Sequence, residues 1–404
     1  MELSGHIWPG LLEMTMTMLF DGALPSVPVS LPTRVERFIA ENRFDHPTLV
    51  LDTDAVVERF HALKSGLGQT HIHYAVKANP AREIIARLVA EGSNFDAASR
   101  GEIELCLSQG ARPEQISFGN TVKRASDIAF AHSAGIRLFA ADAAEELEKI
   151  AEHAPGAMVY LRLLVDNPQA DWPLSRKFGS DRDMAIELCA LAKELGLQPV
   201  GLSFHVGSQT RRASMWTGVL DYVAGVWADA KSAGHDLTLI NIGGGFPAFY
   251  GEPVEAPAAY AAEVRRMVVA RFPGARIMAE PGRGLVAECG AIACEVMLVS
   301  RKSGDDLHRW VYLDIGKFSG LAETIDEAIR YQFATPHDGE ATGPCILAGP
   351  SCDSADVLYE KRPVALPMSL RSGDRIVIRN TGAYTSSYSS VGFNGFPPLD
   401  VIVL

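Results

Sequence analysis

The stretch HIHYAVKANPAREIIARLVAEGSNFDAAS, residues 71–99, decides the fold of this chain. It opens with an apolar run at His71–Lys77 that is typical of a buried strand. Apolar residues then recur every three to four positions over Ala81–Glu91, which predicts an amphipathic helix. A second apolar run at Asn94–Ala98 follows, and the Ser-x-x-Glu pattern that begins at Ser99 predicts another capped helix. The stretch is therefore one strand–helix unit and the start of the next.

The same unit recurs along the chain, and eight runs qualify as strands. They are His71–Lys77, Asn94–Ala98, Gln115–Gly119, Arg137–Ala141, Met158–Val165, Pro199–Val206, Leu237–Ile242 and Arg276–Ala279. Strands that alternate with helices in this way pair in parallel, and eight units close a TIM-type (β/α)8 barrel. A doubly wound open sheet is the alternative.

The pattern changes after about residue 290. Short apolar runs separated by turns and loops replace the strand–helix units there, which predicts a second, mostly β domain. Its strand candidates are Ala291–Val299, Trp310–Leu313, Cys345–Ala348, Arg375–Arg379 and Val401–Leu404, and Thr48–Leu51 could pair with them. We therefore predict a loosely ordered extension at 1–30, a barrel at 53–290, and a β-domain made of 31–52 with 291–404.

Composition limits the classes of partner. The 404 residues include 37 Lys and Arg against 49 Asp and Glu, a formal net charge of −12. General binding to nucleic acid or to an anionic membrane requires clustered Lys and Arg, so we expect neither partner. No stretch reaches the ~18–20 uncharged apolar residues of a spanning helix. The apolar run at 11–20 lacks the preceding basic residues of a secretory signal.

Cysteine usage points to a reducing compartment. The six cysteines show no CxxC pair and no zinc-like spacing with histidine. Scattered cysteines in a chain of this length are typical of a cytoplasmic protein without a disulfide framework. We expect a cytoplasmic location and no metal site.

In a barrel of this kind the reactive side chains lie at the carboxyl ends of the strands. Lys77 ends an apolar strand, where an ammonium is costly to bury unless it is neutralised or used covalently. A salt-bridged lysine is the alternative. Gly243, Gly244 and Gly245 follow another strand and could gather backbone N–H groups around a phosphate, although a simple tight turn is also possible.

The tetrapeptide EPGR places the carboxylate of Glu280 three residues before the guanidinium of Arg283. A structural ion pair is one interpretation. Pyridoxal phosphate, however, requires this combination of groups: a lysine at a strand end, a glycine nest, an arginine and a carboxylate. Lys77 would form the Schiff base, Arg283 would hold the phosphate, and Glu280 would keep the ring nitrogen protonated. The ring of His205, at another strand end, could stack on the cofactor.

Seven motifs in order carry a resemblance to a known family. They are HYAVKAN (73–79), FDAAS (95–99), SFHVGSQ (203–209), IGGGFP (242–247), EPGR (280–283), GPSCDSAD (349–356) and GAYTSSYSSVGFNGF (382–396). From about residue 35 to its end the chain resembles the ornithine/lysine/diaminopimelate decarboxylases, the fold-type III pyridoxal-phosphate enzymes. The ornithine branch is the nearest. The resemblance implies an alanine-racemase-like barrel and β-domain and a head-to-tail homodimer with shared active sites.

The resemblance also implies roles for particular residues. Lys77 matches the Schiff-base lysine, Glu280 the partner of the ring nitrogen and His205 the stacking ring. The charged pair near the lysine and the residues around the phosphate match Asp96, Arg162, Ser208, Gly243, Gly244, Gly245, Gly282, Arg283 and Tyr384.

The same resemblance assigns the proton donor and the substrate ligands. Cys352 matches the residue that protonates the substrate carbon after carbon dioxide leaves, and Asp353 matches a ligand of the distal amine. Both would reach into the partner subunit's site. The second acidic ligand falls in 316–329, where Asp326 or Glu327 is nearest to the expected position and Glu323 is a weaker candidate.

The implied activity is decarboxylation of a basic amino acid, with L-ornithine giving putrescine and CO2 in polyamine biosynthesis. A glutamate facing the ring nitrogen favours decarboxylation, whereas an arginine there would suit racemisation. A bifunctional lysine/ornithine decarboxylase is the first alternative and a non-catalytic regulatory homologue a remote one. A phosphate-sugar enzyme on a plain barrel would leave Cys352, Tyr384 and the second domain without a role.

Overall fold

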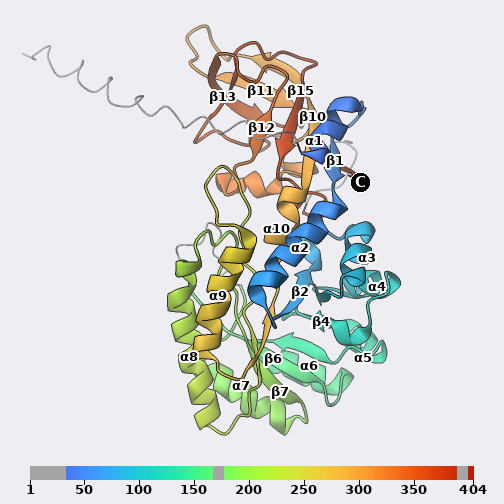
Figure 1. Ribbon diagram of the computed structural model, residues 1–404, viewed down its shortest axis with the longest axis vertical. Coiled ribbons are helices and arrows are strands. Elements are labelled where there is room, and N and C mark those ends of the chain that lie inside the picture. The colour runs from blue at the N-terminus through green and yellow to red at the C-terminus, as the bar shows by residue number, and fades with distance from the viewer. Residues whose placement is uncertain (1–32, 167–176, 389–398) are drawn as a thin grey trace, which may run out of the picture. The chain divides into compact units, whose positions relative to one another are not determined.

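The computed structural model describes residues 33–166, 177–388 and 399–404. The predicted extension at 1–30 lies outside these residues. Arg34–Leu404 belong to one compact unit, which combines a closed eight-stranded barrel with a separate eight-stranded sheet (Figure 1).

The barrel strands follow one another in chain order, and all of them are parallel. They are β2 (His71–Ala75), β3 (Asn94–Ala97), β4 (Ile116–Phe118), β5 (Leu138–Ala141), β6 (Met158–Arg162), β7 (Gln198–Ser203), β8 (Leu239–Asn241) and β9 (Arg276–Ala279). Pairing of β2 with β9 closes the ring. The predicted TIM-type barrel is confirmed, and the open doubly wound sheet is excluded.

Helices surround the strands and connect them (Figure 1). They are α2 (Thr53–Leu67), α3 (Arg82–Ala90), α4 (Arg100–Ser108), α5 (Ala125–Ser133), α6 (Ala144–His153), α7 (Arg182–Glu194), α8 (Thr217–Ser232) and α9 (Pro257–Arg271). Each buries one apolar face against the strands, as Ile84, Ile85 and Leu88 do in α3. At the start of α4 the Ser99 hydroxyl accepts from the backbone N–H of Glu102, as predicted.

The second sheet takes its strands mainly from the end of the chain. They are β1 (Thr48–Leu51), β10 (Gly290–Ser300), β11 (Arg309–Leu313), β12 (Gln332–Ala334), β13 (Thr342–Ala348), β14 (Val364–Pro367), β15 (Arg375–Arg379) and β16 (Asp400–Val403). Their order is β12-β15-β10-β11-β13-β14, and β1 pairs antiparallel with β10 and parallel with β16. The expected pairing of Thr48–Leu51 with this sheet is therefore confirmed. Sequence analysis missed β12 and β14, which are only three and four residues long.

Short helical elements lie between the longer elements along the chain. They are α1 (Arg34–Glu41), α10 (Arg283–Val286) and the 3-10 turns η1 (Val76–Ala78), η2 (Pro113–Gln115), η3 (Ala213–Trp216), η4 (Ala287–Cys289), η5 (Lys317–Ser319) and η6 (Ala322–Glu327).

The loop after β15 fixes the turn that carries Lys77. The backbone N–H of Tyr384 donates to Ala78 O at 2.8 Å, and the Asn79 side chain donates to Gly382 O at 2.8 Å. The hydroxyl of Ser387 donates to the carbonyl of Lys77 itself at 2.8 Å. The sheet therefore contributes directly to the shape of the barrel mouth.

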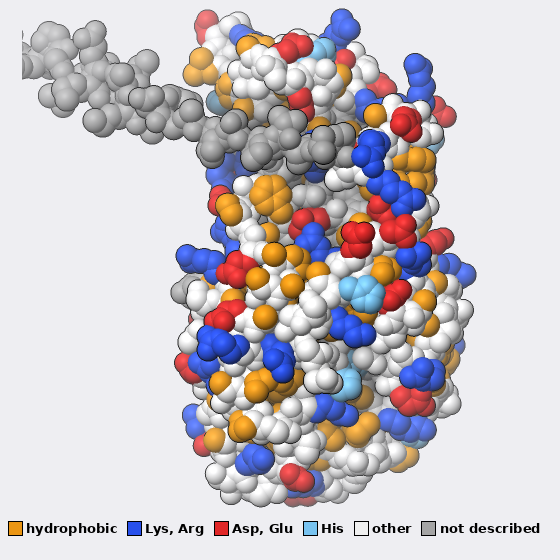
Figure 2. Space-filling view, viewed as in Figure 1, with side chains coloured by type: hydrophobic (Ala, Val, Ile, Leu, Met, Phe, Trp, Pro, Cys, Tyr) orange, Lys and Arg blue, Asp and Glu red, His pale blue; other side chains and the backbone are white. Residues whose placement is uncertain are grey.

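Acidic and basic side chains are interspersed over the face shown in Figure 2. Within the described parts of the chain, no helix has the length and apolar character needed to cross a bilayer.

Candidate active site

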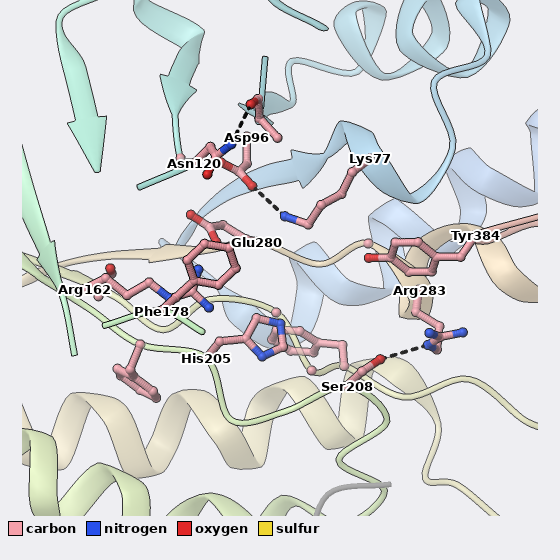
Figure 3. A pocket seen from close by; sticks show the side chains of 18 of the residues that line it. Lys77, Asp96, Asn120, Arg162, Phe178, His205, Ser208, Glu280, Arg283 and Tyr384 are labelled. Carbon is pink, nitrogen blue, oxygen red and sulfur yellow. Dashed lines mark hydrogen bonds and ion pairs between the residues drawn. The ribbon is translucent and has the colours of Figure 1, made fainter. Parts of the chain in front are cut away.

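A cavity of about 530 Å³ lies at the carboxyl ends of the barrel strands (Figure 3). Its volume is within the range of about 300–1,000 Å³ that is usual for small-molecule sites. The predicted site residues that line it are Lys77, Asp96, Arg162, His205, Ser208, Gly244, Gly245, Glu280, Gly282, Arg283 and Tyr384. The structure therefore brings together side chains from six barrel strand ends and from the loop after β15.

Lys77 lies two residues beyond the end of β2, in the turn η1. Its Nζ is 3.2 Å from Oδ2 of Asp96, a residue of the neighbouring strand β3. Burial lowers the pKa of Lys77, but the carboxylates of Asp96 and Glu280 and the phenol of Tyr384 raise it, and the net shift is upward. The second oxygen of Asp96, Oδ1, is buried and has no hydrogen-bond partner among the described residues.

Glu280 follows β9 and faces the same space as Lys77 (Figure 3). The side-chain amide of Asn241 donates to Glu280 Oε1 at 2.5 Å, and the Asn241 carbonyl oxygen accepts from the N–H of Gly243 at 2.9 Å. Burial, followed by the nearby Asp96 carboxylate, raises the pKa of Glu280, while Lys77 and Asn241 act in the opposite direction. A cationic N–H group placed in the cavity would restore the charged form of this carboxyl.

His205 presents a neutral ring to the cavity. Burial lowers the pKa of His205 to about 3, and the positive charges of Arg162 and Lys77 act in the same direction. Its Nδ1 accepts from the N–H of Gly207 at 3.0 Å, which leaves Nε2 as the protonated nitrogen.

The Arg162 guanidinium lies 4.9 Å from the centre of the Phe178 ring, so an aromatic side chain holds its direction.

The turn after β8 requires glycine for steric reasons. Gly243 has φ +66°, and a Cβ there would lie 2.2 Å from the carbonyl oxygen of Phe204. Gly245 has φ +96°, and a Cβ there would lie 2.6 Å from a methyl carbon of Val206. Only glycine adopts this path without strain, and Gly244 and Gly245 consequently expose backbone to the cavity.

Arg283 begins α10 and is 5% exposed. Its Nε donates to the hydroxyl of Ser208 at 3.1 Å, and one terminal nitrogen donates to the hydroxyl of Tyr250 at 3.2 Å. The two terminal nitrogens donate to both carboxylate oxygens of Glu323, at 2.7 and 2.5 Å. The ring of Tyr384 lies 4.9 Å from the guanidinium carbon.

These residues fit pyridoxal phosphate. A lysine amine is available for the aldehyde, and a flat neutral histidine ring and a half-buried carboxylate flank the same space. At the other end lie bare glycine backbone, two hydroxyl groups and an arginine, which is the donor set that binds a phosphate.

The substrate-facing residues expected beyond the cofactor do not line this cavity. Cys352 and Asp353 are exposed on the loop between β13 and β14. The buried carboxylate of Asp356 holds this loop, because it accepts from the backbone N–H groups of Lys317 at 2.8 Å and Ser351 at 3.2 Å. An exposed position on the chain's own surface is compatible with a residue that acts in a partner subunit.

Asp326 and Glu327 also lie outside the cavity lining. Asp326 is exposed and 3.6 Å from the ammonium of Lys361. Glu327 is buried, and its carboxylate lies 2.9 Å from Arg330 and 3.5 Å from Arg362. In the segment 316–329 it is Glu323 that lines the cavity, at the Arg283 end.

Sequence analysis missed several residues that shape the site. Phe178 and Tyr160 line the cavity, Asn241 holds Glu280, and Tyr250 holds Arg283. Asn241 could have been found, because it ends a strand two residues before the glycine turn. Tyr250 and Phe178 lie in loops, where no periodic pattern indicates the direction of a side chain.

Comparison with known proteins gives a consistent result. Residues 53–287 match the family model described as pyridoxal-dependent decarboxylase, pyridoxal binding domain. The chain is 33% identical over 356 residues to the lysine/ornithine decarboxylase of Selenomonas ruminantium, covering 88% of each chain. It is 32% identical over 372 residues to the ornithine decarboxylase of Schizosaccharomyces pombe, covering 88% of this chain and 82% of that protein. Antizyme inhibitor 2 of Xenopus laevis is 31% identical over 363 residues, with 86% and 78% covered.

Solved structures are similar over nearly the whole chain. SrLDC in complex with PLP and cadaverine has a TM-score of 0.82 at 30% identity, covering 93% of this chain and 94% of that one. The arginine decarboxylase of Paramecium bursaria Chlorella virus bound to agmatine has a TM-score of 0.82 at 28% identity, covering 91% and 100%.

Proposed function

The chain belongs to the pyridoxal-dependent decarboxylase family, and from that premise we propose that it converts L-ornithine to putrescine and CO2 in polyamine biosynthesis. The protein is a decarboxylase of basic amino acids whose cofactor is pyridoxal 5'-phosphate. The observation that carries the proposal is that Lys77 and Glu280 line the same cavity, so that an amine and a half-buried carboxylate face one small space. We further propose a cytoplasmic setting.

When bound, the cofactor supplies an electron sink for the electron pair that remains when the bond to the carboxyl carbon breaks. Lys77 anchors the cofactor through its ε-nitrogen and takes up or releases protons there. Glu280 holds a proton at the ring nitrogen, which strengthens the sink. His205 supports the ring face, and Asp96 with Arg162 sets the charge around the lysine.

The other end of the cavity would hold the phosphate. Backbone N–H groups of Gly244, Gly245 and Gly282 are the neutral donors that we propose. Gly243, predicted to join them, instead donates its N–H to Asn241 and serves to shape the turn. The hydroxyls of Ser208 and Tyr384 and the guanidinium of Arg283 complete the set. These groups keep the reactive end of the cofactor aligned with Lys77.

We propose that Cys352 and Asp353 act from the partner subunit of a homodimer. Cys352 then delivers a proton to the substrate carbon, and Asp353 receives the distal ammonium of the diamino acid. Asp326 is a further candidate for that ammonium; it is exposed and does not line the cavity of its own chain, so it would have to act across an interface. Glu327, the other candidate, is buried and paired with Arg330 and Arg362, and would first have to leave these partners.

Steady-state release of CO2 from L-ornithine, L-lysine, L-arginine and diaminopimelate tests the substrate. We expect the highest kcat/KM with ornithine. A lysine value within a few-fold of the ornithine value would instead support a bifunctional enzyme, which the similarity to the Selenomonas lysine/ornithine decarboxylase favours as second candidate. Binding of the cofactor without CO2 release from any of the four would indicate a regulatory homologue.

Shared active sites are tested by mixing two inactive variants. Lys77→Ala and Cys352→Ala chains are unfolded and refolded together, so that mixed dimers carry one intact site. We expect part of the wild-type activity to return, and the refolded single variants serve as controls. Mixed dimers that form but recover no activity would contradict the interface roles of Cys352.

A further inference from the structure

The phosphate end of the cavity contains an acidic side chain beside its arginine. Glu323 belongs to η6, in the connection between β11 and β12, and reaches Arg283 at the start of α10. The pair is bidentate, with contacts of 2.7 and 2.5 Å, and the two side chains are only 4% and 6% exposed. Both residues line the cavity. A carboxylate is an unexpected neighbour for a group that receives a phosphate.

The hydrogen bonds of Arg283 are nearly all in use. A guanidinium has five N–H donors. Ser208 takes one, Tyr250 another and Glu323 two, so a single terminal N–H is left without a partner among the described residues. An incoming phosphate can therefore form one hydrogen bond with Arg283 as it stands, and a forked contact requires that Glu323 yields its place.

The local backbone holds Glu323 in this position. Its carbonyl accepts from the N–H of Ile329 at 3.1 Å, and the next residue, Thr324, donates its hydroxyl to Leu321 O at 2.6 Å. These two hydrogen bonds fix the turn that carries the Glu323 carboxylate, which approaches Arg283 from the side of the β-domain. Its approach to Arg283 is a built feature of the fold.

The charges at this end of the cavity decide how the Arg283–Glu323 pair affects phosphate binding. A buried guanidinium without a counterion is strongly destabilising, and Glu323 removes that cost while the cofactor is absent. A phosphate monoester carries a charge of about −1.5 to −2 at neutral pH, and a carboxylate bound to the same guanidinium would repel it. Glu323 and phosphate therefore stabilise the same arginine and oppose each other.

We propose that Glu323 is an internal counterion of Arg283 that competes with the cofactor's phosphate and thereby sets the affinity for the cofactor. This inference rests on the proposed role of Arg283 as a phosphate ligand. Glu323 acts through Arg283 and is a positioning residue, with no direct part in the chemistry.

The test measures binding of inorganic phosphate and of pyridoxal phosphate to the cofactor-free, full-length protein by titration calorimetry. For Glu323→Gln, which keeps a hydrogen-bond acceptor and removes the charge, we expect both affinities to rise roughly tenfold or more. We also expect a lower Tm without phosphate and a larger upward shift of Tm on adding it. Glu323→Asp keeps the charge, so its phosphate affinity should stay close to that of the wild type.

Glu146→Gln is the matched control. Glu146 is likewise a buried, ion-paired carboxylate, 2.8 Å from Lys123 and 2.6 Å from Lys149, but it does not line the cavity. This variant should lose stability equally with and without phosphate and keep the wild-type phosphate affinity.

Unchanged or weaker phosphate binding by Glu323→Gln would overturn the proposal. If this variant folds only when phosphate is present, the rescue supports it, whereas failure to fold even in millimolar phosphate contradicts it. Arg283→Gln distinguishes the role of Arg283 as a phosphate ligand from the competition between Glu323 and phosphate. If Arg283→Gln leaves phosphate binding intact, the ligand role of Arg283 fails; if it weakens binding while Glu323→Gln has no effect, only the competition fails.

Discussion

The two ends of the cavity each pair a basic side chain with a carboxylate, but they do so differently. Lys77 meets Asp96 through one contact of 3.2 Å, 48% of the lysine side chain is exposed, and Asp96 Oδ1 has no partner among the described residues. Arg283 meets Glu323 through two shorter contacts, and Ser208 and Tyr250 bind it as well. The first end leaves a reactive nitrogen room to change partners, and the second holds its cation in one place.

This difference follows from what each end has to do. A lysine that forms and breaks a covalent bond must exchange its partner during every turnover, so a saturated environment would oppose the reaction. A phosphate group serves as a fixed handle, and fixed donors align the rest of the cofactor at little cost in reorganisation. Substitutions at the open end should therefore affect chemistry, and substitutions at the closed end should affect binding and stability.

The largest effect is expected for Lys77→Ala. Lys77 is the only lysine among the described residues that line the cavity, so its loss should lower kcat by at least about 10³-fold. Borohydride treatment of the wild-type holoenzyme should fix the cofactor on the peptide that contains residue 77, as mass spectrometry would show, and the variant should carry no such label. Lys149→Ala, a half-buried lysine outside the cavity, is the control. Labelling of another lysine in the wild type would contradict the assignment.

Glu280→Gln should give the next largest effect. The amide cannot hold a proton at the ring nitrogen by charge, so we expect kcat to fall about 10²-fold with a much smaller change in cofactor affinity. Stopped-flow absorbance during a single turnover would separate the chemical step from binding. Equal losses in kcat and in cofactor affinity would show that Glu280 mainly holds the cofactor and would contradict its catalytic role.

Asp96→Asn should have a smaller effect. We expect the rate of cofactor attachment at neutral pH to change about tenfold. The Asp96 carboxylate raises the pKa of Lys77 and burial lowers it, so without this charge the pKa falls. Only the unprotonated amine attacks an aldehyde, and its fraction at neutral pH should therefore increase. The attachment rate, followed by absorbance between pH 6 and 10, should rise at a lower pH than in the wild type. A pH profile shifted upward would contradict this reasoning.

The sequence predicted the open end better than the closed one. Lys77, Asp96, Glu280 and Arg283 were expected near one another because they follow barrel strands, and parallel strands bring their carboxyl ends to one mouth. The resemblance makes Glu323 a candidate ligand of the substrate's distal amine, whereas its contacts are with Arg283. It comes from an irregular 3-10 turn in the connection between β11 and β12, where neither period nor strand order indicates the direction of a side chain.

The smallest effect should come from Tyr250→Phe at the closed end. Burial raises the pKa of Tyr250 to about 12, so its hydroxyl is neutral and accepts from Arg283 at 3.2 Å. Removing it leaves one buried guanidinium N–H without a partner, which should cost about 1–2 kcal/mol of unfolding free energy and change kcat less than about threefold. Tyr331→Phe is the matched control, because the buried Tyr331 hydroxyl has no hydrogen-bond partner among the described residues and its ring lies 5.7 Å from that of Tyr250. Denaturant unfolding of the cofactor-free variants measures the difference. A loss in Tyr331→Phe as large as in Tyr250→Phe would show that the effect comes from removing a buried hydroxyl in general and not from losing the bond to Arg283.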